Sequence, residues 1–110
     1  GIINLEAMAC ETAVVASAVG GIKEVVLPGQ TGLLVPFEQE STPPFEAADP
    51  RGFARDLAAA INRLMADDAL RAAMGAAGRE RAVQIYSWRA IARQVMQLYE
   101  RLTGQGGAQP

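Results

Sequence analysis

The sequence predicts an α/β fold in which two short parallel strands are followed by three C-terminal helices. Two apolar runs, Ala13–Ser17 and Leu33–Val35, have the length of strands that are covered on both faces. Ile22–Val26 between them predicts a short helix in the crossover that parallel strands need. After residue 49 the apolar residues recur at helical spacing, which predicts the helices.

The N-terminal stretch predicts a loop, a short helix and a tight turn before the first strand. Gly1 lets the backbone approach a ligand closely, and Asn4 can cap the helix. A helix start behind a glycine loop favours anions, because its unpaired N–H groups and its dipole both attract negative charge. Glu6, in the first turn or two, is by itself better explained as a helix-stabilising acid.

Two glycine-rich turns flank the short middle helix. Gly20 and Gly21 follow the first strand, at the carboxyl edge where open α/β sheets bind ligands. On their own they are better explained as a plain tight turn. Pro28, Gly29 and Gly32 form the turn before the second strand.

Residues 36–49 are expected to be an irregular, exposed loop, since they hold adjacent prolines and three glutamates. A solvated connection explains this loop better than a Pro-Pro-Phe recognition motif. Phe37 and Phe45 are expected to anchor it to the surface.

Three amphipathic helices follow, and each has a candidate N-cap. Asp49 precedes Pro50 at the first helix, Asp67 or Asp68 begins the second, and Ser87 begins the third. The apolar stripes comprise Phe53, Leu57, Ile61 and Leu64 in the first helix, Leu70, Ala73, Met74 and Ala77 in the second, and Trp88, Ile91, Ala92, Val95, Met96, Tyr99 and Leu102 in the third.

The second of these helices has two unusual features. Gly75 and Gly78 each weaken it by roughly 1 kcal/mol relative to alanine, and they permit close packing. Residues 79–81, Arg-Glu-Arg, are better explained as a solvated face than as a basic patch, because acids lie nearby.

Composition bounds the classes of function. The chain has 110 residues and a net charge of −2, which gives no reason to expect nucleic acid or an anionic membrane as a partner. The single cysteine, Cys10, excludes an internal disulfide and suits a reducing cytosol, so a cytoplasmic location is expected. No apolar run approaches the roughly 20 residues of a membrane span. No cluster of Asp, His and Cys indicates a metal, and no cofactor is expected.

Three segments in this order carry a family resemblance: residues 1–10, 19–26 and 29–35. They resemble the donor-site segments of retaining two-domain (GT-B type) glycosyltransferases of family 4, the family that includes glycogen synthases. The actinobacterial type of glycogen synthase is the most similar. The resemblance implies the latter half of a Rossmann-like C-terminal domain of such a GT-B glycosyltransferase. On this interpretation the chain is expected to divide into a partial donor-binding segment at 1–35, a loop at 36–49, C-terminal helices of the same domain at 50–102 and a disordered tail at 103–110.

The resemblance also implies a nucleotide-sugar donor site. Gly1, Ile2 and Ile3 are expected against the diphosphate, and Glu6 is expected to accept hydrogen bonds from the ribose hydroxyls. Gly20 and Gly21 are expected in a loop beside the donor. Glu6 matches the second glutamate of the family's glutamate pair, and the first would lie upstream of Gly1. The family usually has a glycine near Glu11, so the glutamate here is a departure.

The chain is therefore expected to be the C-terminal part of a longer hexosyltransferase. The catalytic residues and the acceptor site would lie in the remainder, so the isolated segment is expected to be inactive and to need no metal. In the family the final helix crosses onto the N-terminal domain. Without that domain, its apolar stripe would be exposed or used for self-association.

Three hypotheses of function remain open. The first is a glycogen synthase-like transferase that moves a glucosyl unit from a nucleotide sugar, with ADP-glucose favoured, to an α-glucan or a glucose phosphate. The second is a sugar-nucleotide epimerase of the same architecture. The third is a non-enzymatic interaction module that uses the apolar stripe of the last helix.

Overall fold

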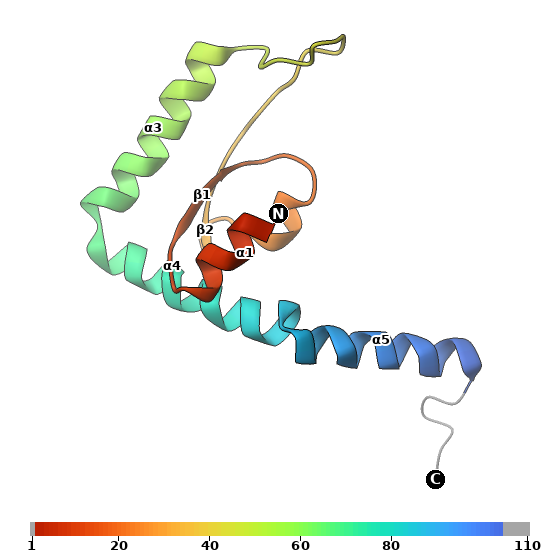
Figure 1. The fold of residues 1–110 in the computed structure, drawn as a ribbon. Helices are drawn as coiled ribbons and strands as arrows, with labels where there is room; N and C mark the ends of the chain where they lie inside the picture. The colour runs from red at the N-terminus through yellow and green to blue at the C-terminus, as the bar shows by residue number, and fades with distance from the viewer. Residues whose placement is uncertain (1, 105–110) are drawn as a thin grey trace.

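The structure, a computed structural model, describes residues 2–104. Figure 1 shows the order of the elements along the chain. They are α1 (Ile2–Ala9), β1 (Val14–Ser17), α2 (Ile22–Val25), β2 (Gly32–Val35), α3 (Pro50–Ala66), α4 (Asp68–Arg81), a π-helical turn η1 (Ala82–Tyr86) and α5 (Trp88–Thr103). This confirms the predicted α/β order of strand, short helix, strand and three long helices.

The two strands pair in parallel, as predicted, with Val14 opposite Gly32 and Ser17 opposite Val35. Gly32 is required at this position, since a Cβ there would lie 2.2 Å from the carbonyl oxygen of Val14. The turn before β2 is fixed by the buried Thr31, whose hydroxyl accepts a hydrogen bond from the Leu27 N–H at 2.9 Å.

The main core lies where α1, β1, α2 and η1 meet. Its buried residues are Met8, Val14, Val25, Val26 and Ala82. Met8 comes from α1 and is fully buried, so this helix is anchored by its C-terminal half. The N-terminal half of α1 remains at the surface (Figure 1).

The two glycines of α4 allow α1 and the following turn to pack directly on this helix. A Cβ at Gly75 would lie 2.1 Å from the carbonyl oxygen of Glu11, and one at Gly78 would touch the Met8 side chain at 3.4 Å. The expectation of close packing is therefore confirmed. Glu11 itself has φ 58°, the left-handed conformation that glycine adopts more easily.

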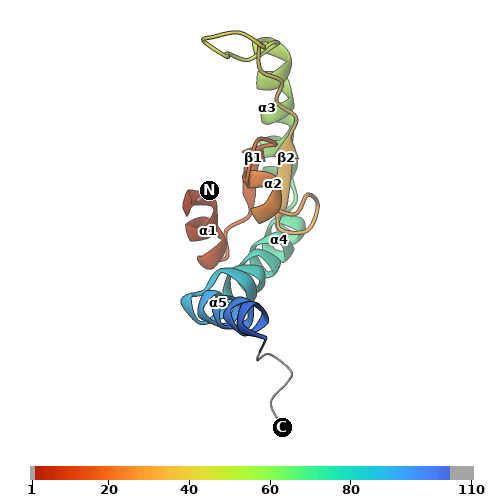
Figure 2. The same cartoon turned by 90° about the vertical axis from the view of Figure 1, so that its right-hand side faces the viewer.

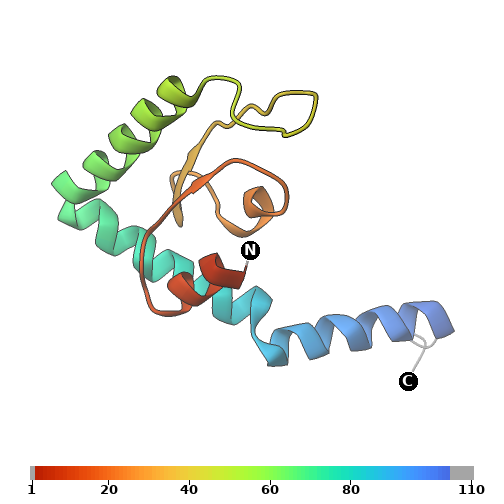
Figure 3. The same ribbon diagram turned by 45° about the horizontal axis from the view of Figure 1, so that its top comes forward.

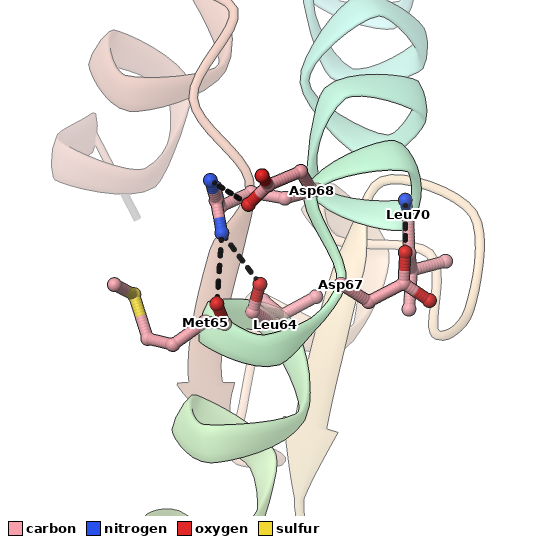
Figure 4. Close-up of polar contacts among 6 residues, drawn as sticks. Leu64, Met65, Asp67, Asp68 and Leu70 are labelled. Carbon is pink, nitrogen blue, oxygen red and sulfur yellow. Dashed lines mark hydrogen bonds and ion pairs between the residues drawn. The ribbon is translucent and has the colours of Figure 1, made fainter.

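The caps predicted for the three long helices are all present. The Asp49 carboxylate accepts from the Gly52 N–H at 3.0 Å, and the Ser87 hydroxyl accepts from the Ala90 N–H at 3.1 Å. Of the two candidates for α4, Asp67 is the cap, because its carboxylate accepts from the Leu70 N–H at 2.9 Å (Figure 4).

Several local predictions were wrong. Asn4 lies inside α1 and does not precede it, so it is not the cap. Ile61 and Ala73 are exposed although they lie on predicted apolar stripes, because α3 and α4 each bury only a narrow face. Phe45 is 48% exposed and does not anchor the loop.

The loop of residues 36–49 is irregular and mostly exposed, as predicted. Phe37 does anchor it: its ring meets that of Phe53 edge-on, with ring centroids 5.0 Å apart. A single antiparallel bridge joins Gln39 and Ala47 across the loop.

The last helix projects from the rest of the molecule. Figures 1 and 3 show α5 running away from the strands after η1. Its apolar stripe is exposed in the described residues, as predicted, with Trp88 at 87% and Leu102 at 79%. Thr103, placed in the tail by the sequence, ends this helix, and residues 105–110 lie outside the described residues.

Candidate functional site

The start of α1 is the first part of the candidate donor site. Ile2 and Ile3 are 73% and 78% exposed, and Glu6 is exposed one turn further on. The first N–H groups of any helix have no acceptor within it, so this end is free to take hydrogen bonds from an anion. Gly1 lies outside the described residues.

The Glu6 carboxylate makes no hydrogen bond or ion pair within residues 2–104. A carboxylate offers two acceptor oxygens, which suits a pair of neighbouring hydroxyls such as those of a ribose. The residues on either side of Glu6, Leu5 and Ala7, pack against the core that buries Met8, and this packing fixes the place of Glu6 at the surface.

The turn at Gly20 and Gly21 is the second part. It follows β1 at the carboxyl end of the sheet, where the Ala18 N–H still donates to the Val35 carbonyl at 2.8 Å. Gly20 has φ 50°, and nothing lies within 4 Å of a Cβ built on either glycine. The turn is therefore open to a ligand on its outer side.

The two parts lie on neighbouring elements. Leu5 of α1 and Ile22 of α2 pack against the same core cluster. Figure 1 and Figure 3 both show the N-terminal end of α1 beside α2. The fold thus packs α1 and α2, the helices next to the two parts of the candidate site, against each other and against one core.

Two arginines of residues 79–81 bind backbone carbonyl oxygens at the C-terminal ends of α1 and α2. Arg79 donates to the carbonyl oxygen of Ala9, and Arg81 donates to those of Glu24 and Val25. The interpretation of residues 79–81 as a solvated face with acids nearby holds for Arg79 and Glu80, which are exposed, Arg79 lying 3.8 Å from the Glu11 carboxylate. It was wrong for Arg81, which is half-buried. Local spacing carries no signal for these contacts, since they join residues more than fifty positions apart.

A separate hollow of about 240 Å³ lies at the start of α3, between the helix and the 36–49 loop. Three carboxylates line it, from Glu38, Asp49 and Asp56. Such a lining repels a diphosphate, so this hollow does not suit a nucleotide.

Within residues 2–104 no group of three or more His, Cys, Asp or Glu is arranged to hold a metal ion. None of the helices in this part of the chain is long and apolar enough to cross a membrane.

Comparison with known proteins gives the fold its context. Residues 1–42 match the family described as "Glycosyl transferases group 1". The chain is also similar to a solved structure, the sucrose-phosphate synthase of Thermosynechococcus elongatus, with a TM-score of 0.71 and 44% sequence identity over 94% of this chain and 23% of that one. The fold is that of a segment of a GT-B glycosyltransferase.

Curated relatives extend the similarity over nearly the whole chain. The alpha-maltose-1-phosphate synthase of Mycolicibacterium smegmatis is 48% identical over 103 residues, which are 94% of this chain and 24% of the relative. The phosphatidyl-myo-inositol mannosyltransferase of the same organism is 37% identical over 106 residues, 96% of this chain and 24% of the relative. These relatives are glycosyltransferases, and the chain spans about a quarter of their length.

Proposed function

We propose that this chain is the donor-binding C-terminal part of a retaining glycosyltransferase that transfers a glucosyl unit from a nucleotide sugar. The observation that carries the proposal is the match of residues 1–42 to group 1 glycosyl transferases, together with 48% identity to a sugar phosphate synthase along nearly the whole chain. The exposed start of α1 and the open Gly20–Gly21 turn support a ligand at this place.

The proposed donor is ADP-glucose, and the proposed acceptor is a glucose phosphate or an α-glucan, as in a glycogen synthase-like enzyme. The name of the relative, an alpha-maltose-1-phosphate synthase, supports the glucose phosphate acceptor. Maltose 1-phosphate consists of two glucose units and a phosphate, which is the product of glucosyl transfer to a glucose phosphate. The single exposed thiol, Cys10, fits the proposed cytoplasmic setting.

The reaction breaks the bond between the anomeric carbon and the diphosphate oxygen, and forms a bond from that carbon to an acceptor hydroxyl oxygen. The bonding electrons leave with the nucleoside diphosphate, and the acceptor proton passes to a base. N–H groups of residues 1–3 would stabilise charge growing on the diphosphate, the kind of contribution that is usually largest. Glu6 would accept from the ribose hydroxyls. The base and the acceptor contacts would come from the remainder of the enzyme.

The role of Glu6 can be tested by calorimetric titration of ADP and UDP into the whole enzyme that contains this chain. Glu6→Ala should weaken the binding of the preferred nucleotide by roughly 1.5–3 kcal/mol, the scale of a hydrogen bond to a charged group. The nucleotide that binds more tightly identifies the base of the donor.

The matched control is Glu46→Ala, which removes another exposed glutamate, from the 36–49 loop. It should leave nucleotide affinity unchanged. If neither nucleotide binds the wild-type enzyme, the transferase proposal fails. If Glu6→Ala changes stability but not affinity, Glu6 is a helix-terminal acid and not a ribose ligand.

One observation favours a second candidate. The exposed stripe of α5, from Trp88 to Leu102, is apolar enough to bind another surface, either the rest of a longer chain or a second copy. A purely non-enzymatic interaction module would fold and associate without any affinity for ADP or UDP, so the same titration separates the two. A sugar-nucleotide epimerase would bind the nucleotide but would transfer no sugar to an acceptor.

A further inference from the structure

Two arginines on α4 hold the C-terminal ends of the two short helices that carry the candidate donor site. Arg79 Nη1 donates to the carbonyl oxygen of Ala9, the last residue of α1. Arg81 donates through Nη2 to the Glu24 carbonyl at 2.6 Å and through Nε to the Val25 carbonyl at 3.0 Å, at the end of α2.

Tyr86 completes the contact with α2. Its hydroxyl donates to the same Glu24 carbonyl at 3.2 Å, and its ring lies 5.7 Å from the Arg81 guanidinium carbon, within the range of a cation–π contact. The π-helical turn η1 contains Tyr86, so this irregular turn ends with the residue that reaches α2.

These contacts matter because both helices are too short to be stable alone. The helix α1 has eight residues and α2 has four, whereas isolated helices shorter than about 12 residues are marginal in water. The last carbonyls of a helix also lack partners within it, and a cation there complements the helix dipole. Arg79 and Arg81 therefore supply the hydrogen-bond donors and the positive charge that the C-terminal ends of the two helices lack.

The opposite end of each helix bears a part of the candidate site. The start of α1 presents Ile2 and Ile3, with Glu6 one turn further on, and α2 is entered directly from the Gly20–Gly21 turn. A tilt at one end of so short a helix moves the other end. We propose that Arg79 and Arg81 are positioning residues, which set the start of α1 against the Gly20–Gly21 turn so that both meet one nucleoside diphosphate. This inference rests on the proposed function.

The same helix provides a matched control. Arg71 Nη1 donates to the carbonyls of Leu64 at 2.7 Å and Met65 at 3.4 Å, at the end of α3 (Figure 4). Its contact is of the same chemical kind as that of Arg81, a guanidinium on two helix-terminal carbonyls. However, α3 carries no residue of the candidate site.

The experiment compares Arg81→Gln, Arg79→Gln and Arg71→Gln in the whole enzyme, by thermal unfolding and by calorimetric titration with ADP and UDP. All three should lower the unfolding temperature. Arg81→Gln and Arg79→Gln should also weaken the affinity for the preferred nucleotide by about tenfold, the scale of one well-placed hydrogen bond to a charged group. Arg71→Gln should leave that affinity unchanged.

Two milder variants serve if Arg81→Gln does not fold. Arg81→Lys keeps the charge but not the two-pronged geometry, and Tyr86→Phe removes only the hydroxyl that reaches Glu24. Both should fold and should still lose several-fold in nucleotide affinity relative to Arg71→Lys.

The outcomes separate the two proposals. If the wild-type enzyme binds neither nucleotide, the proposed function fails and the positioning role fails with it. If the wild-type enzyme binds, and the Arg81 and Arg71 variants have the same affinity, then the arginines only stabilise the fold. In that case the positioning role is overturned while the proposed function stands.

Discussion

Glycine positions decide how closely single residues of this chain approach one another. Gly75 is buried in α4 against the carbonyl oxygen of Glu11, which belongs to the turn after α1. Gly78, one turn further along α4, faces Met8, and the atom nearest to an added Cβ would be the side-chain Cγ at 3.4 Å. A flexible side chain can shift to make room, whereas the backbone of a tight turn cannot.

This difference predicts that the same substitution has different effects on stability at the two glycines. Gly75→Ala should lower the free energy of unfolding by about 1–3 kcal/mol, because the new Cβ would lie 2.1 Å from the Glu11 oxygen and the packing would have to open. Urea unfolding of the chain measures the change.

Gly78→Ala is the control on the same helix. Its Cβ would meet Met8 at 3.4 Å, an ordinary contact, while the helix gains up to about 1 kcal/mol of propensity. It should therefore be neutral or stabilising. Equal losses in both variants would contradict the packing of α1 on α4 described above.

At the scale of elements, the corner between α3 and α4 is fixed by a small set of polar contacts. Asp67 caps α4, and Arg71 reaches back to the last carbonyls of α3 (Figure 4). Arg71 also pairs with Asp68 at 2.6 Å, but the Asp68 side chain is 88% exposed. Exposed ion pairs contribute little to stability because water screens them.

We expect Asp67→Ala to destabilise the chain by about 1 kcal/mol through the loss of the cap on the Leu70 N–H. Asp68→Ala, which removes an adjacent acid of the same type, should cost clearly less. Chemical denaturation of the two variants under identical conditions provides the comparison. A larger loss for Asp68→Ala would mean that the cap is assigned to the wrong aspartate.

At the scale of the whole molecule, the chain is thin and extended. Its extents are 59 × 41 × 17 Å, and the narrow dimension is evident in Figure 2. The radius of gyration is 17.9 Å, whereas a compact domain of this length would have about 13 Å. The two-stranded sheet and the projecting α5 therefore leave apolar surface that a compact domain would bury.

Trp88 reports on this surface, because it is the only tryptophan of the chain and is 87% exposed. In the 110-residue chain at low concentration, acrylamide should quench its fluorescence almost as strongly as it quenches free tryptophan. Quenching that weakens as the concentration rises would show that copies of the chain cover α5. Strong protection at every concentration would contradict the exposed placement of Trp88.

Sequence reasoning was reliable where the signal is local. The caps of the three long helices depend on residues within a few positions, and the strands and the glycines of α4 were marked by their own residue types, although the partners they meet lie far away in the sequence. It was weaker for burial on helix faces: Ile61 and Ala73 have the right spacing but no neighbour to cover them. It also missed η1, since no local residue pattern marked a π-helical turn there.

The sequence by itself determined the order of the elements, the caps of the three long helices, and the residues 1–42 that match a glycosyl transferase family. Only the tertiary structure decided that Arg79 and Arg81 hold the ends of α1 and α2. The physical reason is that caps and turns depend on neighbours along the chain, whereas a guanidinium binds any carbonyl that the fold brings within reach. Arg81 binds the Glu24 carbonyl although the two residues are 57 positions apart in the sequence, and no local residue pattern predicts such a contact.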